Sequence, residues 1–350
     1  SYTDQTLELL AFSEEISNQP TITEFAKVDL TGGQEIEGAK MQILDQDGKV
    51  VEEWVSKKEP HVVYALEPGE YVLHEEQVPT EQGYVRAEDV KFVVEETVDV
   101  QKVKMEDDHT KVSISKTDIT DGKEIEGAKL QILDQDGEVV ESWTTGEEHL
   151  IEYLPVGTYT LHEEAAVDGY IVANDVEFTV EETGEIQKVK MEDERAMGQL
   201  VIVKTDTDSK AALEGVEFVL LEKETGKEVG RLKTGKDGKA VSELLPIGTY
   251  ENGVFKEPIT YVLKETATLK GYEKTEEEWE IVFTYQNDKT PVIEVVKEIQ
   301  NKKIPETPGT VKPGPKTGDD TNWFLPLLAL GVSAGMVAGL LYYRKRHKKA

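Results

Sequence analysis

The sequence predicts an all-β protein, made of antiparallel β-sandwiches in tandem, followed by a Pro-rich spacer and one C-terminal transmembrane helix. Three observations predict this organisation. A block of sequence recurs at a period of roughly ninety residues, which is typical of serial domains. Apolar and polar residues alternate within each block, which is typical of strands with one buried face. An apolar run near the C-terminus has the ~20 residues that a helix needs to cross a bilayer.

The repeats are visible as copied segments. The segment Glu35-Ile-Glu-Gly-Ala-Lys-Met-Gln-Ile-Leu-Asp-Gln-Asp-Gly reappears at Glu124 with its Met replaced by Leu. A third, more divergent copy keeps Lys204-Thr-Asp and Leu245-Pro-Ile-Gly-Thr-Tyr. We therefore divide the chain into repeats at residues 21–109, 110–196 and 197–303, a Pro-rich spacer at 304–322, a transmembrane helix at 323–343 and a basic tail at 344–350.

The N-terminal residues 1–20 are predicted to be a linker or the end of a truncated preceding domain. Asn18 stands nine positions before Lys27, as Asp107 stands nine positions before Lys116. Because the chain begins at Ser1 with no start Met and no signal peptide, although its C-terminus implies export, we expect it to be the C-terminal part of a longer precursor.

Strand patterning is clear inside each repeat. Ala128, Leu130 and Ile132 alternate with polar residues, and Asp-Gly pairs recur between such runs. The segments Asp45-Gln-Asp-Gly and Asp134-Gln-Asp-Gly resemble part of a calcium loop, but the distant Glu of an EF-hand is missing. An Asp-Gly pair between two strands predicts a hairpin turn instead.

Composition narrows the classes of partner. The formal charge is -32, and residues 304–350 carry seven Lys or Arg against three acidic residues, so the rest of the chain carries -36. Such a surface repels phosphate, which excludes nucleic acid as a partner. The chain has no cysteine, so disulfides cannot stabilise it. We find no metal-spaced cluster and no Ser-His-Asp arrangement, and we predict no cofactor and no active site for an external substrate.

Alternation also indicates which polar residues point into the core. Each repeat places a lysine, a glutamate and an Asp or Asn on strand faces that are otherwise apolar. These residues are Lys27, Glu75 and Asp107; Lys116, Glu163 and Asp193; and Lys204, Glu265 and Asn301. Burying them is costly unless they are paired or neutralised, and burial lowers the pKa of a lysine and raises that of a carboxyl. A neutral lysine is a nucleophile, so such a set either forms an amide or remains a buried ion pair.

The segments around two of these glutamates carry a family resemblance. Leu161-His-Glu-Glu-Ala-Ala-Val-Asp-Gly-Tyr and Leu263-Lys-Glu-Thr-Ala-Thr-Leu-Lys-Gly-Tyr resemble the Leu-x-Glu-x-x-Ala-Pro-x-Gly-Tyr box of the collagen-adhesin B-type repeats of Gram-positive adhesins and pilins. The resemblance implies an Ig-like, or prealbumin-like, sandwich. It also implies an intramolecular isopeptide bond from the first-strand Lys to the last-strand Asn or Asp, with the box Glu as proton shuttle. The bonds would join Lys27 to Asp107, Lys116 to Asp193 and Lys204 to Asn301.

The C-terminal end resembles a sortase cell-wall sorting signal. Pro315-Lys316-Thr317-Gly318 precedes the apolar run, and a basic cluster follows it, which belongs on the cytoplasmic side of the membrane. The resemblance implies that a sortase cuts between Thr317 and Gly318 and transfers Thr317 to peptidoglycan, so the membrane holds the protein only before sorting. An ordinary permanent membrane anchor is the alternative, but it leaves Pro-x-Thr-Gly unexplained.

Together these features predict a wall-anchored, adhesin-type surface protein whose visible part is a mechanically stable stalk. We expect a ligand-binding head upstream of Ser1, through which a host or pilin partner would bind. Two alternatives remain open. A pilus subunit would need a Tyr-Pro-Lys motif, which the sequence lacks, and the stalk could instead be the wall-anchored spacer of a surface enzyme.

Overall fold

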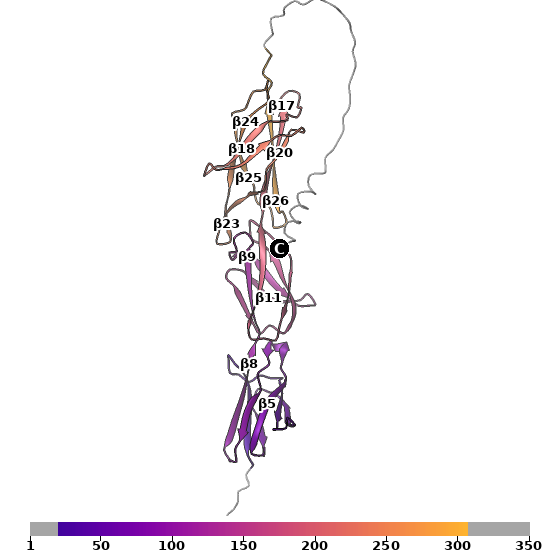
Figure 1. The fold of residues 1–350 in the computed structure, drawn as a ribbon, viewed down its shortest axis with the longest axis vertical. Coiled ribbons are helices and arrows are strands. Elements are labelled where there is room, and N and C mark those ends of the chain that lie inside the picture. Colours follow the sequence, from indigo (N-terminus) through magenta and orange to yellow (C-terminus); the bar gives the residue numbers. More distant parts are fainter. Residues whose placement is uncertain (1–19, 307–350) are drawn as a thin grey trace, which may run out of the picture. The chain divides into compact units, whose positions relative to one another are not determined.

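The computed structural model describes residues 20–306, which form an all-β structure with a single short 3-10 helix, η1 (Thr80–Gln82) (Figure 1). The expected Pro-Lys-Thr-Gly motif, apolar span and basic tail lie outside the described residues, as do residues 1–19. Within residues 20–306, no helix is long and apolar enough to span a membrane.

The first repeat is a sandwich of two four-stranded sheets. One sheet has the order β4-β1-β8-β6 and the other β3-β2-β5-β7. The strands are β1 (Ile22–Asp29), β2 (Lys40–Leu44), β3 (Val50–Val55), β4 (His61–Tyr64), β5 (Gly69–Gln77), β6 (Tyr84–Val85), β7 (Val90–Val94) and β8 (Val100–His109). Asp45 Oδ1 accepts hydrogen bonds from the backbone N–H groups of Asp47 and Lys49, so the Asp-Gly segment between β2 and β3 is the predicted hairpin turn.

The second repeat copies this arrangement. Its sheets have the orders β12-β9-β16-β14 and β11-β10-β13-β15. The strands are β9 (Lys111–Asp118), β10 (Lys129–Leu133), β11 (Val139–Thr144), β12 (His149–Glu152), β13 (Gly157–Ala165), β14 (Tyr170–Ile171), β15 (Val176–Val180) and β16 (Ile186–Arg195).

The third repeat differs by an inserted hairpin, β22–β23. One sheet has the order β20-β17-β21 with β26 also paired to β17, and the other β19-β18-β24-β25. The strands are β17 (Met197–Asp206), β18 (Glu217–Glu222), β19 (Glu228–Lys233), β20 (Lys239–Val241), β21 (Leu245–Pro246), β22 (Gly248–Glu251), β23 (Val254–Pro258), β24 (Thr260–Ala267), β25 (Glu278–Val282) and β26 (Val292–Asn301).

The inserted hairpin separates the start of the motif Leu-Pro-x-Gly-Thr-Tyr from its tyrosine, although the sequence shows the motif as continuous in the third repeat. In the second repeat Tyr159 donates its hydroxyl to Pro155 O, and in the third repeat Tyr261 donates to Pro246 O. Tyr250, which follows Leu245-Pro-Ile-Gly-Thr directly, instead lies on the inserted hairpin.

The sandwiches are not purely antiparallel. In every repeat the first and last strands pair in parallel: β1 with β8, β9 with β16 and β17 with β26. A parallel pair needs a long crossover connection, and here the rest of the sandwich supplies it. The first strand therefore enters at one end of the repeat, and the last strand leaves at the other.

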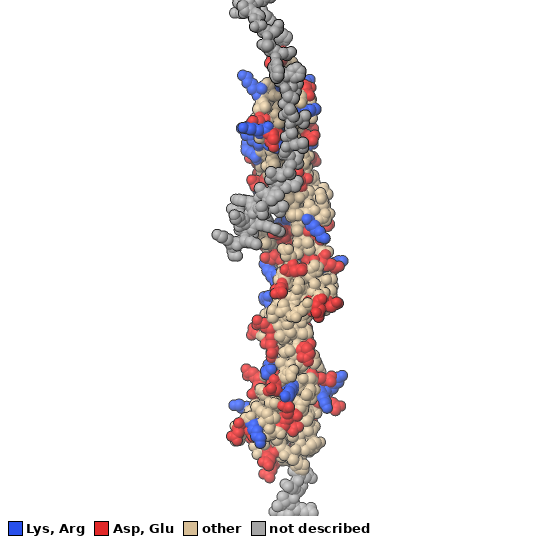
Figure 2. Space-filling model, turned by 90° about the vertical axis from the view of Figure 1, so that its right-hand side faces the viewer, with Lys and Arg blue, Asp and Glu red and all other residues tan. Residues whose placement is uncertain are grey.

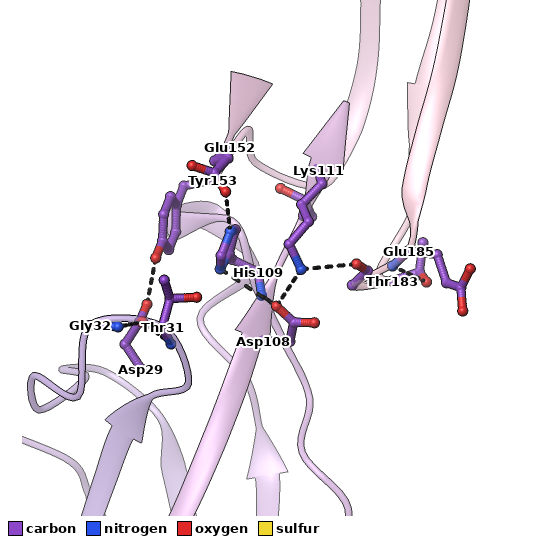
Figure 3. Close-up of polar contacts among 12 residues, drawn as sticks. Asp29, Thr31, Gly32, Asp108, His109, Lys111, Glu152, Tyr153, Thr183 and Glu185 are labelled. Carbon is purple, nitrogen blue, oxygen red and sulfur yellow. Dashed lines mark hydrogen bonds and ion pairs between the residues drawn. The ribbon is translucent and has the colours of Figure 1, made fainter. Parts of the chain in front are cut away.

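The first two repeats are joined by a single residue that is hydrogen-bonded to both of them. Thr110 separates β8 from β9; its N–H donates to Gly83 O in the first repeat and its hydroxyl donates to Leu154 O in the second. At the same junction the Tyr153 hydroxyl donates to Asp29 Oδ2 at 2.7 Å, and the Tyr153 ring stacks on His109 at 3.9 Å between centroids (Figure 3).

The second junction uses the inserted hairpin. Ala196 separates β16 from β17, and its N–H donates to Gly169 O. Tyr250 of the hairpin also donates to Gly169 O at 2.8 Å, while the Arg195 guanidinium lies 4.1 Å from the centre of the Tyr250 ring. At both junctions, therefore, hydrogen bonds and ring contacts tie the connecting residue and its neighbours to the adjoining repeat.

The described surface is predominantly acidic. Acidic side chains are spread over the face of the described residues that Figure 2 shows, and basic side chains are fewer there. Several basic residues are already paired with acidic neighbours, as Lys104 is with Glu106 at 2.7 Å and Lys190 with Glu192 at 2.6 Å.

Candidate functional site: three buried lysine clusters

Each repeat buries a lysine, a glutamate and an Asp or Asn in one cluster. The lysine lies on the first strand and the Asp or Asn on the last, which are neighbours in one sheet. The glutamate lies on the central strand of the facing sheet: Glu75 on β5, Glu163 on β13 and Glu265 on β24. All nine residues are at most 4% exposed, which confirms the inward orientation that alternation predicted.

Strand register explains why the groups meet. Lys27 lies opposite Met105 in the parallel pair, so Asp107 stands two positions further along β8 on the same face. Lys116 lies opposite Met191 and Lys204 opposite Ile299, with the same offset to Asp193 and Asn301. The long lysine side chain spans this offset, while apolar neighbours such as Met105 exclude water.

In the first repeat the lysine contacts two carboxyls. Lys27 Nζ donates to Asp107 Oδ1 and lies 3.1 Å from Glu75 Oε2. The backbone N–H of Ala87 also donates to Glu75 Oε2, at 3.2 Å. Glu75 Oε1 and Asp107 Oδ2 are buried without a hydrogen-bond partner.

The second repeat has the same geometry. Lys116 Nζ donates to Asp193 Oδ1 and lies 2.9 Å from Glu163 Oε2. The backbone N–H of Ala173 donates to Glu163 Oε2 at 2.6 Å. Glu163 Oε1 and Asp193 Oδ2 again lack a partner, so the unpaired oxygens belong to the arrangement and not to one repeat.

The third repeat replaces the second carboxyl by an amide. Lys204 Nζ donates to Asn301 Oδ1 and lies 3.2 Å from Glu265 Oε2. Asn301 Nδ2 donates to Glu265 Oε1 at 2.7 Å and to Thr268 Oγ1 at 2.8 Å. One glutamate oxygen therefore faces the lysine nitrogen, and the other faces the amide nitrogen.

Burial changes the acid-base properties of these groups. Burial raises the pKa of Asp107 to about 7, against the lowering effect of Lys27, and Glu75 raises it further. Burial likewise raises the pKa of Asp193 to about 7, with Lys116 opposing and Glu163 reinforcing the shift. In the third repeat burial lowers the pKa of Lys204, and Glu265 partly offsets this. These pKa shifts favour the neutral acid at Asp107 and Asp193 and the neutral amine at Lys204, and the neutral forms are the ones that can condense.

The arrangement is chemically suited to amide formation. A neutral lysine is a nucleophile, and it lies within hydrogen-bonding distance of a carboxyl or carboxamide. A carboxyl that contacts both the nucleophile and the leaving group can move a proton between them. Within residues 20–306, no group of three His, Cys, Asp or Glu residues is placed to hold a metal ion.

Sequence reasoning missed three partners of these clusters. The N–H groups of Ala87 and Ala173 are backbone donors, which side-chain patterns do not reveal. Thr268 follows β24 in the box of the third repeat, where its side-chain direction depends on the turn. The predicted sorting residues Pro315, Lys316, Thr317 and Gly318 lie outside the described residues.

Comparison with known proteins agrees with this architecture. The family described as SpaA, prealbumin-like fold domain, matches residues 21–109, 110–195 and 198–258. The third match ends at Pro258, the last residue of the inserted hairpin. Comparison with curated proteins gives no match.

Solved structures with a similar fold include a protein of Bacillus anthracis. The Bacillus anthracis TIE protein is 27% identical, covering 81% of this chain and 51% of that chain, with a TM-score of 0.55. This chain thus spans about half the length of that protein. BcpA, the major pilin subunit of Bacillus cereus, is 15% identical over 82% of this chain and 100% of its own, with a TM-score of 0.46, which is too low to bear on function.

Serial β-sandwiches that pair their first and last strands around a buried lysine define a repeat protein of the prealbumin-like class. The chain belongs to the SpaA family of prealbumin-like fold domains, which it carries in three tandem copies.

Proposed function

We propose that the chain is the stalk of a wall-anchored, adhesin-type surface protein, and that each repeat is closed by an intramolecular isopeptide bond. The observation that carries this proposal is the repeated burial of a lysine against an Asp or Asn on the neighbouring strand. An ion pair alone gives little net stability once the desolvation of both charges is counted, so its retention in three cores favours a further role.

The proposed reaction is a condensation. In the third repeat Lys204 Nζ attacks Asn301 Cγ, the bond from Cγ to Nδ2 breaks, and ammonia leaves. Glu265 takes a proton from the lysine through one oxygen and returns a proton to the leaving nitrogen through the other, as its two contacts allow. In the first two repeats the same attack on Asp107 or Asp193 releases water.

The bonds would give the stalk its mechanical function. The chain enters a repeat at the first strand and leaves at the last, and because these strands are parallel, a pulling force acts on them at opposite ends of the repeat. A bond from Lys27 to Asp107 would carry that force past residues 28–106. The single-residue connections at Thr110 and Ala196 would then pass it directly to the next repeat.

Intact mass tests the proposal. The full 350-residue chain, purified before sorting, should weigh less than its sequence by one ammonia and two waters, because one acceptor is Asn and two are Asp. Proteolysis should yield branched peptides that join each lysine to its partner. A full sequence mass without branched peptides would show that the clusters are ion pairs.

We also propose that sortase joins Thr317 to peptidoglycan, on the sequence evidence of Pro315-Lys316-Thr317-Gly318 followed by the apolar run and the basic tail. Thr317→Ala should leave the protein in the membrane, so that detergent releases it and a peptidoglycan-digesting enzyme does not. The parent should show the opposite behaviour and lack Arg344–Lys349 when recovered from wall fragments. Release of the parent by detergent with its tail intact would identify a permanent membrane anchor.

A further inference from the structure

Thr268 makes a contact that only the third cluster contains. Its Oγ1 accepts a hydrogen bond from Asn301 Nδ2 at 2.8 Å, and Glu265 Oε1 accepts from the same nitrogen at 2.7 Å. Thr268 stands three residues after the cluster glutamate. The residues at that place in the first and second repeats are Val78 and Ala166, which have no polar side-chain atom.

The difference at this place follows the chemistry of the acceptor. A carboxamide nitrogen has two N–H donors, and both need acceptors when buried, whereas a carboxyl has at most one donor. Asn301 is 2% exposed, so water does not satisfy its second N–H. Thr268 occurs with Asn301, and apolar residues occur with Asp107 and Asp193. The hydroxyl therefore matches the additional donor.

We infer that Thr268 is a positioning residue for isopeptide formation in the third repeat, an inference that rests on the proposed bond. By accepting the second N–H, Thr268 holds the amide with Nδ2 toward Glu265 and Oδ1 toward Lys204. In this orientation the lysine meets the carbonyl side of the amide, and the proton shuttle meets the leaving nitrogen. The net reaction is unchanged: amine and amide become isopeptide and ammonia.

Removing the hydroxyl should slow the bond without changing its product. Thr268→Val preserves the shape of the side chain but leaves one N–H unpaired, which favours rotation of the amide away from this orientation. The full chain would be made by cell-free synthesis, quenched in denaturant at intervals and digested, and the branched peptide of Lys204 and Asn301 quantified. We expect its formation to be about tenfold slower in Thr268→Val, the size expected for one buried unpaired donor. Thr268→Ser should restore most of the rate.

A second pair of variants separates positioning from stability. Lys204→Met cannot form the bond, so adding Thr268→Val to it measures the structural cost alone, by hydrogen exchange of third-repeat amides. A purely structural threonine would cost stability in this background and leave the bond rate of the folded chain unchanged. If Thr268 positions the amide, Thr268→Val slows formation of the bond even when the same fraction of the chain is folded.

Transfer to the second repeat tests the match between the hydroxyl and the amide. Asp193→Asn should release ammonia slowly there, because Ala166 offers no acceptor. Adding Ala166→Thr to Asp193→Asn should accelerate the release of ammonia about tenfold. Ala166→Thr alone, with Asp193 kept, should not accelerate the release of water. Equal rates with and without the hydroxyl in both repeats would overturn the positioning role. Absence of any branched peptide in the parent would instead overturn the proposed bond.

Discussion

The first and third repeats place the same three positions in contact but satisfy their polar atoms differently. In the first repeat Glu75 Oε1 and Asp107 Oδ2 have no partner, and the pKa of Asp107 is raised to about 7 by burial. In the third repeat Asn301 donates its N–H groups to Glu265 Oε1 and Thr268 Oγ1, so Glu265 Oε2 is the one cluster oxygen without a hydrogen-bond partner. Two carboxyls beside one lysine need a proton to remove their mutual repulsion, whereas a carboxyl beside an amide does not.

The difference shows that one cluster geometry accommodates two acceptor chemistries through local changes around it. The acidic repeats hold the glutamate with a backbone N–H, from Ala87 or Ala173. The amide repeat holds it through Asn301, which Thr268 supports. If the proposed bond forms, both routes end in the same isopeptide, so the repeats should differ before the reaction and agree after it.

Removing the proton shuttle should have the largest effect. Glu265→Gln keeps the shape of the side chain but cannot move a proton between Lys204 and Asn301, so the third repeat should fold without its bond. The bond closes a loop between residues separated by 97 positions, so its loss should lower the free energy of unfolding by ~4 to 5 kcal/mol in the loop-entropy description. We expect the third-repeat transition to fall by roughly 20 °C in calorimetry.

The matched control is Glu278→Gln in the same repeat. Glu278 lies on β25 and pairs with Lys264 at the surface, at 2.5 Å, so its removal should change stability by less than about 1 kcal/mol. Equal transitions in the parent and Glu265→Gln would mean that the parent carries no bond in this repeat.

Dependence on pH should separate the acidic repeats from the amide repeat when the lysine is removed. Lys27→Met prevents the bond and removes a cation that lowers the pKa of Asp107, so burial keeps this pKa raised. A carboxyl with a raised folded pKa stabilises the fold below its unfolded pKa of 3.8, and this contribution is lost as pH rises through the folded value. The free energy of unfolding of the first repeat should therefore fall by ~2 to 3 kcal/mol between pH 5 and pH 7.

The corresponding change in the third repeat is the control. Lys204→Met leaves Asn301, which does not titrate, so this acceptor contributes no loss over the same range. Hydrogen exchange of core amides, read repeat by repeat, gives both values. The parent should also lack the loss in its first repeat, because Asp107 becomes an amide. A parent that loses stability like Lys27→Met would contain a free Asp107 and an ion pair.

The sequence predicted the sandwich and the inward groups because alternation reports directly on side-chain direction in a strand. Lys204, for example, follows Leu200 and Ile202 on one face, and all three are buried. The sequence did not predict the inserted hairpin. Leu245-Pro-Ile-Gly-Thr-Tyr250 matches the motif that ends at Tyr159 in the second repeat, but in the structure Tyr261 takes the place of Tyr159. Tyr153 was missed as well, since its contact with Asp29 crosses 124 positions and depends on how two repeats pack.

The smallest effect should follow exchange of the acceptor itself. Asn301→Asp would release water instead of ammonia, yet the bonded product is the same molecule, with the same atoms between Lys204 and residue 301. The free energy of unfolding should therefore agree with the parent within about 0.5 kcal/mol, as expected for a change with no structural consequence. In the unlinked Glu265→Gln background the same exchange should matter, because it removes the N–H groups that reach residue 265 and Thr268. The two pairs of variants therefore report whether the bond is present. If Asn301→Asp lowers the free energy of unfolding equally in both backgrounds, the parent repeat is held by hydrogen bonds and charge, and not by a bond.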